Sequence, residues 1–160
     1  MNKSRIAPEI LSPIFILIIL MAFHLAACRV GRQTPQNQVC FEKNCVEVEI
    51  VQKEADVQRG LQGREYLDPK AGMLFVFPES RRYSFWMKET LIPLDMIWMD
   101  YARRVVFIAA DVPPCRNDPC PTYTPSSEAM YVLETNAGYA QKNSIKVGAA
   151  AEFRNGGHIP

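Results

Sequence analysis

The sequence predicts a mainly β fold, a compact antiparallel β-sandwich or partly closed barrel with one or two short helices. The chain has 160 residues, enough for one ordinary domain plus flanking segments, and its 48% hydrophobic content supports a packed core. Most apolar residues fall in short runs bounded by Gly, Pro, Asn or Asp, which is the pattern of strands and turns. Good helix formers gather in only two short stretches, so we expect seven or so strands with few helices.

The strands are expected in the following order along the chain. Residues 46–50 alternate apolar and charged side chains, which is typical of a strand with one face in water. Further short strands are predicted at residues 73–77, 84–88, 94–99, 105–108, 131–135 and 151–153. Short helices are expected within residues 53–61, where Gly60 ends the stretch, and within residues 137–143. A proline-rich loop, residues 111–127, precedes the last strands.

Residues 1–27 are predicted to be a lipoprotein signal peptide. Lys3 and Arg5 give a basic start, and the ten residues 14–23 are all apolar. A helix that crosses a bilayer needs about 20 residues, so this run fits the hydrophobic region of a signal peptide. The motif Leu-Ala-Ala-Cys that ends at Cys28 resembles the lipobox of bacterial lipoproteins, which implies cleavage before Cys28 and a diacylglyceryl group on its sulfur. An uncleaved N-terminal anchor is the alternative.

The predicted export divides the chain and limits its partners. Residues 28–39 are interpreted as the lipidated Cys28 and a polar tether, residues 40–154 as a single β-rich domain, and residues 155–160 as a loose C-terminal tail. We expect the protein outside the cytoplasm, attached to a membrane of the cell envelope by its lipid anchor. The formal net charge is +1, and loss of residues 1–27 would make basic and acidic side chains equal in number. This balance lacks the basic excess that indicates a nucleic-acid partner.

The predicted domain has cysteines in two pairs with the same C-x4-C spacing: Cys40, Cys45, Cys115 and Cys120. In an exported protein an even number of cysteines in local pairs indicates disulfides. A zinc site formed by all four is the alternative, although structural zinc more often uses a gap of two residues. Crossed pairing between the two pairs also stays open.

The histidines exclude several kinds of catalysis. The sequence has two, His24 and His158, and removal of the signal peptide would leave only His158. Ser-His-Asp and Cys-His mechanisms would then lack their base, and a histidine-rich metal site would lack its ligands. The sequence has no Gly-x-x-x-x-Gly-Lys loop and no dinucleotide-binding fingerprint. We therefore expect no cofactor and no metal, and no catalytic residue is assigned.

The first candidate binding cluster consists of Trp86, Lys88, Thr90 and Asp95. Strand alternation would place Trp86 and Lys88 on one face, and the turn that follows would bring Asp95 back beside Lys88. This arrangement would form a polar floor beneath an aromatic wall, able to hold a sugar or a small anion. In the interpretation that we favour, Lys88 and Asp95 instead form a partly buried ion pair that fixes the connection between two strands.

The second candidate cluster consists of Glu134 and Asn136. Glu134 is an acid among positions that suggest core, so burial would raise its pKa unless Arg59, Arg64 or Lys88 compensates its charge. Such a carboxyl can serve as a general acid or base, or as a metal ligand. In the simpler interpretation, which we favour, Glu134 accepts hydrogen bonds from the turn that follows and Asn136 caps the next helix.

Several stretches of the sequence together resemble one known family. They are Arg-Gly-Leu-Gln-Gly-Arg at residues 59–64, Gly-Met-Leu-Phe-Val-Phe at 72–77, Phe-Trp-Met-Lys-Glu-Thr-Leu-Ile-Pro-Leu-Asp at 85–95, and Tyr-Val-Leu-Glu-Thr-Asn-Ala-Gly at 131–138. In this order they are similar to the domain of unknown function family 192, a widespread prokaryotic family, over about residues 46–148. The resemblance implies a compact, β-rich and often exported domain, and it supplies no catalytic residues.

The favoured hypothesis for function is a non-enzymatic module, tethered to the membrane of the cell envelope, that binds a small ligand or an envelope protein. The alternative is a carboxylate-based hydrolase acting on cell-wall or saccharide substrates. That enzyme would need two carboxyl groups facing one cleft, roughly 5–9.5 Å apart, and Asp95 and Glu134 are the pair to measure. A purely structural lipoprotein without a pocket is the third possibility.

Overall fold

The structure is a computed structural model that describes residues 37–154. The predicted signal peptide, the predicted lipidation site Cys28, most of the predicted tether and the predicted tail lie outside the described residues. The end of the predicted tether, Gln38 and Val39, belongs to the first strand, and Val39 is fully buried. The folded domain therefore begins slightly before residue 40, because this strand pairs with a neighbour on each side.

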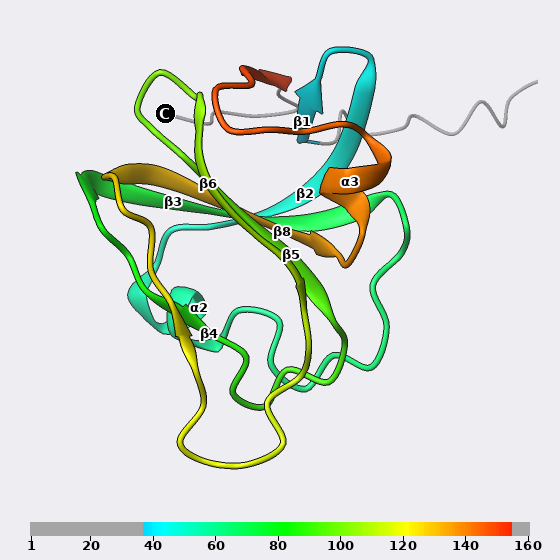
Figure 1. The fold of residues 1–160 in the computed structure, drawn as a ribbon, viewed down its shortest axis with the longest axis vertical. Coiled ribbons are helices and arrows are strands. Elements are labelled where there is room, and N and C mark those ends of the chain that lie inside the picture. Colours follow the sequence, from blue (N-terminus) through cyan, green and yellow to red (C-terminus); the bar gives the residue numbers. More distant parts are fainter. Residues whose placement is uncertain (1–36, 155–160) are drawn as a thin grey trace, which may run out of the picture. The chain divides into compact units, whose positions relative to one another are not determined.

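Seven strands form one sheet, which confirms the mainly β class (Figure 1). Across the sheet the strands are β6 (Val105–Val112), β5 (Leu94–Met99), β8 (Ala129–Asn136), β3 (Ala71–Arg81), β2 (Asn44–Val51), β1 (Gln38–Phe41) and β9 (Ala151–Arg154). A small second sheet and two short helices complete the described part: β4 (Phe85–Trp86), β7 (Thr122–Tyr123), α2 (Glu54–Arg59) and α3 (Tyr139–Lys142).

The large sheet is curled, and its two edges meet at one end. Neighbouring strands are antiparallel except β2 and β3, which run parallel because the connection that contains α2 carries the chain back before β3 begins. An isolated bridge joins Arg104, just before β6, to Ala150, just before β9. Beside it the N–H of Ala151 donates to the carbonyl of Arg103 (2.9 Å). Of the two predicted architectures, the chain therefore forms the partly closed barrel.

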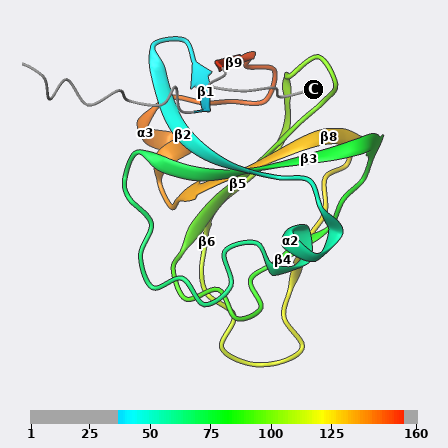
Figure 2. The same cartoon turned by 180° about the vertical axis from the view of Figure 1, so that it is seen from behind.

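Both faces of the central strands are covered. Along β3 and β8, Leu74 and Leu133 face a core that also includes residues of β1, β9 and α3. The alternate residues Phe75 and Val132 face a second core, on the side of α2 and β4 (Figure 2). Because neither face of these strands meets water, they carry the continuous apolar runs of the sequence rather than a strict alternation.

Most predicted elements are present, with different lengths. β5 has the predicted bounds, whereas β3, β6 and β8 are longer than expected. The strand predicted at residues 84–88 is only the two-residue β4, since the chain turns where the N–H of Thr90 donates to the carbonyl of Met87 (3.2 Å). β1 and β7 were not predicted, because each is short and because β7 pairs only with β4, which is distant in the sequence.

The four cysteines pair locally. A disulfide joins Cys40 to Cys45 across the hairpin of β1 and β2, and another joins Cys115 to Cys120 in the loop before β7. The hairpin and the loop lie at opposite ends of the domain (Figure 1), so neither crossed pairing nor one zinc site shared by all four is formed. Within residues 37–154 no three His, Cys, Asp or Glu side chains gather as metal ligands. No helix in this range has the length and apolar character to cross a membrane.

Candidate functional site

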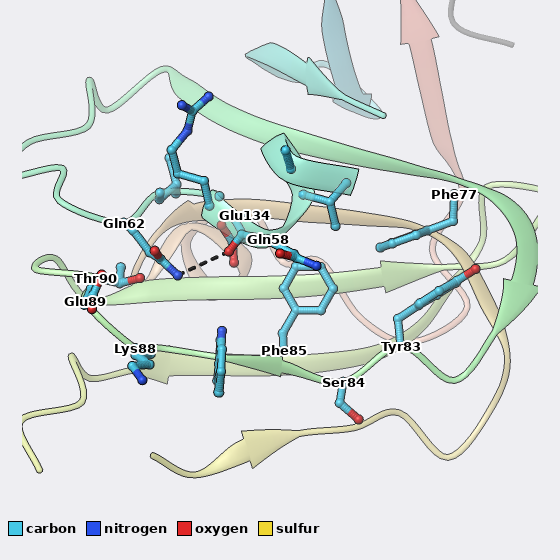
Figure 3. Close-up of a pocket in the computed structure, with 16 residues that line it drawn as sticks. Gln58, Gln62, Phe77, Tyr83, Ser84, Phe85, Lys88, Glu89, Thr90 and Glu134 are labelled. Carbon is cyan, nitrogen blue, oxygen red and sulfur yellow. Dashed lines mark hydrogen bonds between the residues drawn. The ribbon is translucent and has the colours of Figure 1, made fainter. Parts of the chain in front are cut away.

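A cavity of about 780 Å³ lies over the face of the sheet that α2 and β4 cover (Figure 3). Phe77 and Tyr83 stand at one end of the cavity in this view, with Lys88 and Thr90 at the other. Glu134 lies between these two ends. The cavity therefore combines an aromatic part with charged and polar side chains from several elements.

The aromatic wall is held by contacts between rings. The rings of Phe77 and Tyr83 are stacked, with their centres 3.6 Å apart. The ring of Phe85 meets Phe75 edge to face (4.9 Å between centres) and Trp98 in the same way (5.6 Å). Trp98 and Phe75 are buried core residues, so they fix the position of Phe85. The wall is therefore largely preformed.

The more open part of the lining is polar. Trp86 is half exposed, and the Lys88 Nζ lies 5.6 Å from the centre of its ring, so the prediction that these side chains share a face is confirmed. Thr90 is buried beside them. On the side of α2, the Nε2 of Gln62 donates to the carbonyl of Gln58 (3.2 Å), drawn as the dashed line in Figure 3.

Glu134 is the buried acid of the cavity. It lies on β8 opposite Met73 of β3 and Met96 of β5, and both methionines are buried. Only 4% of Glu134 is exposed, and among the described residues no donor and no cation contacts its carboxyl. Burial therefore raises the pKa of Glu134 to about 8.

Gly72 allows the strands to approach closely at this point. A Cβ added at Gly72 would lie 2.7 Å from the carbonyl oxygen of Glu134, closer than real Cβ contacts come. Glycine at this position therefore keeps β3 and β8 paired beside the acid, and it holds the backbone of Glu134 in place.

Five of the candidate residues from the sequence line this one cavity: Arg59, Trp86, Lys88, Thr90 and Glu134. The cations do not compensate the acid. The exposed guanidinium of Arg59 pairs with Asp56 of the same helix (2.8 Å), and Lys88 lies over Trp86. Arg64 does not line the cavity, because it pairs with Glu49 on the surface.

Asp95 is not part of this site, so the predicted ion pair with Lys88 is wrong. Asp95 is fully buried and pairs in register with Thr135, one residue beyond Glu134. Since side chains alternate along a strand, Asp95 and Glu134 point to opposite faces of the sheet.

The carboxylate of Asp95 is occupied by backbone donors. Its Oδ1 accepts hydrogen bonds from the N–H groups of Asp111 (2.8 Å) and Gly138 (3.1 Å), and its Oδ2 accepts one from the N–H of Ala140 (2.7 Å). Asp95 thereby takes the helix-capping role that we assigned to Glu134 and Asn136, and that assignment is wrong. Asn136 instead donates to the carbonyls of Leu67 and Asp68 (3.1 and 3.0 Å).

Several residues that line the cavity were not among the candidate site residues predicted from the sequence: Gln58, Gln62, Phe77, Tyr83, Phe85 and Glu89. Two signals could have found some of them. Gln58 and Gln62 are four residues apart, which places both on one side of a helical turn. Phe77 is two residues beyond Phe75 in the predicted strand, so both face the same side of the sheet.

These features define a class of protein, a small mainly β domain whose half-barrel sheet carries a cavity of ligand size on one face. Residues 37–153 match the model of DUF192, a family described as uncharacterized ACR, and the chain belongs to this family. The family resemblance predicted from the sequence is confirmed.

Two solved structures resemble the chain in fold and sequence. A protein of unknown function from Novosphingobium aromaticivorans is 30% identical, with a TM-score of 0.66 over 73% of this chain and 83% of that one. A protein from Sinorhizobium meliloti, described as a candidate transcription regulator, is 26% identical, with a TM-score of 0.67 over 74% of this chain and 92% of that one. No match is found among curated proteins.

Replacement of Asp95 by Ala is expected to lower the free energy of unfolding by roughly 3 kcal/mol or more, because three backbone donors would lose their acceptor. Asp100→Ala is the matched control, since its Oδ1 accepts one hydrogen bond, from the N–H of Arg104 (2.9 Å), at the surface. We expect the control to lose less than about 1 kcal/mol. Urea unfolding at neutral pH measures both variants, and equal losses would contradict the role given to Asp95.

The burial of Glu134 is expected to make the fold less stable as the pH rises. In the unfolded chain this carboxyl ionises near its ordinary value of 4.5, whereas its pKa in the folded protein is about 8. Between these values the folded state keeps a proton that the unfolded chain has lost. The free energy of unfolding therefore falls by roughly 1.4 kcal/mol per pH unit and levels off above the folded pKa.

Urea unfolding between about pH 5 and 9 measures this slope. Residues 37–154 contain no histidine whose titration would add a second pH dependence. Glu134→Gln should remove the slope, whereas Glu65→Gln, at an exposed carboxyl outside the cavity, should keep it. A slope that persists in Glu134→Gln would show that Glu134 is not the desolvated group.

Proposed function

We propose that the domain binds a small molecule in the cavity between the sheet and the layer of α2 and β4. In this proposal the protein is a binding module of the cell envelope, held at the membrane by a lipid on Cys28. The cavity has the size of typical small-molecule sites, which range over about 300–1,000 Å³.

The observation that carries the proposal is the carboxyl of Glu134. Buried polar groups in native proteins nearly always have a hydrogen-bond partner, and a buried group without one costs free energy. Glu134 receives no donor from the described residues, yet its side chain lines a cavity large enough for a ligand. A ligand that supplies the missing partner would recover this cost on binding.

The lining supports the same proposal. The rings of Phe77, Tyr83 and Phe85 offer apolar area without a large loss of side-chain freedom, because contacts with other rings already hold them. Polar side chains on the opposite side, such as Thr90 and Gln62, add hydrogen-bonding groups that can orient a ligand.

A hydrolase that uses Asp95 and Glu134 as its two carboxyl groups does not fit this geometry. The two acids point to opposite faces of the sheet, and the oxygens of Asp95 already accept three backbone hydrogen bonds. Since such an enzyme needs both groups in one cleft, binding is the function that this site supports best.

A screen of small cationic, neutral and anionic fragments by ligand-observed NMR tests the binding proposal. Trp86→Ala should weaken the fragments that bind by about tenfold, because Trp86 lines the cavity. Tyr101→Ala is the control, at an exposed aromatic residue outside the lining, and it should leave binding unchanged. Binding that is equally strong in both variants, or no binding by any fragment, would contradict the proposal. Hydrolysis of a saccharide probe would favour the enzyme instead.

The lipid anchor is tested separately. The motif before Cys28 supports cleavage and acylation, so mass spectrometry of the membrane fraction should find an N-terminal peptide that begins with lipid-modified Cys28. Cys28→Ser should move the protein out of that fraction or leave its signal peptide uncleaved. An intact peptide that begins at Met1 in the unaltered protein would overturn the lipoprotein proposal and leave the cavity proposal untouched.

A further inference from the structure

We infer that the ligand carries an ammonium group at its inner end, which pairs with the carboxylate of Glu134, and an apolar body that lies against Phe77, Tyr83 and Phe85. This inference rests on the proposed function and names the chemical class of the ligand. It differs from the sugar or small anion suggested by the pattern around Trp86, because the acid that faces this cavity is Glu134 rather than Asp95.

The charges of the lining leave Glu134 as the group without a counter-ion. Besides Glu134, the charged side chains on the cavity are Arg59, Lys88 and Glu89. Arg59 already pairs with Asp56 (2.8 Å), and the Nζ of Lys88 lies over the ring of Trp86. Glu89 is exposed. The buried part of the cavity therefore holds one acid and no compensating cation, although the more exposed part is mixed in charge.

An ammonium group matches this environment better than a hydroxyl or an anion. A neutral hydroxyl would supply one hydrogen bond, whereas an ammonium supplies up to three donors and the opposite charge, whose attraction is strong where water is excluded. The neighbouring rings also favour a cation over a neutral group. An anion could bind beside Glu134 only while the carboxyl is protonated and donates a hydrogen bond. An ionised Glu134 would repel the anion.

Proton release is the distinguishing property of this mode of binding. Below the folded pKa of about 8, Glu134 carries a proton, and that proton must pass to the solvent before the carboxylate can pair with an ammonium. Apparent affinity should therefore rise by about tenfold per pH unit up to that pKa and then level off. The other titratable groups that line the cavity are Arg59, Tyr83, Lys88 and Glu89, so the test includes a variant of Glu89.

Three probes of nearly equal size and shape test the inference on the full chain: phenethylammonium, 2-phenylethanol and phenylacetate. Calorimetry near pH 8 should show that phenethylammonium binds at least about tenfold more tightly than the alcohol or the anion. In two buffers of different ionisation enthalpy, at a pH well below 8, about one proton should be released per bound cation. This measurement needs no variant, so it holds even if a substitution impairs folding.

Variants then assign the effect to one residue. Glu134→Gln should remove both the preference for the cation and the proton release, whereas Glu89→Gln should keep the proton release. If the alcohol or phenylacetate binds as tightly as phenethylammonium or more tightly, and Trp86→Ala removes that binding, this inference is overturned and the proposed function stands. If none of the three probes binds in a manner sensitive to Trp86→Ala, the inference also fails, and the fragment screen alone then decides the proposed function.

Discussion

The constraint on which the site depends is that β8 lies in the middle of the sheet and is covered on both faces. Residues 131–135 are all buried, so the alternation that turns Thr135 towards one core turns Glu134 towards the other. The close approach of β3 at Gly72 fixes the backbone of Glu134 from the side. Its side chain therefore lines the cavity instead of the core that β1, β9 and α3 share.

Two acids on neighbouring strands show how differently burial can be compensated. Asp95 accepts three backbone N–H groups, and these bonds tie β5 to β6 and to the start of α3. Its burial is therefore a source of stability. Glu134 is buried nearly as deeply and receives no donor from the described residues, so it lowers stability at neutral pH. This contrast between the two acids supports the proposal that the cavity beside Glu134 is a binding site.

The sequence predicts the fold well where the signal is local. β5 follows from a run of apolar residues interrupted only by Asp95, and Gly60 marks the end of the first helix because it has a positive φ that favours glycine. The burial of Glu134 was also expected, from an acid among core positions, and its raised pKa agrees with the case in which no cation compensates its charge. The local disulfides agree with the C-x4-C spacing.

The features of the fold and site that the sequence could not predict depend on strand register and on contacts between distant segments. The opposite orientation of Asp95 and Glu134 depends on pairing between strands about 40 residues apart, and a shift of one residue would reverse it. β7 also depends on a distant contact, because it forms only by pairing with β4. Whether a cation compensates Glu134 was left open by the sequence, and Arg59 does not do so because it has a nearer partner in Asp56, three residues away on the same helix.

A carbon-13 NMR titration of the Glu134 side-chain carboxyl would show directly whether this group is desolvated and unpaired in the folded protein. The assignment can be made by comparison with Glu134→Gln. We expect a midpoint near the folded pKa of about 8, well separated from the midpoints of carboxyls on the surface. A midpoint close to the ordinary value of 4.5 would contradict it, since the carboxyl would then be solvated or paired.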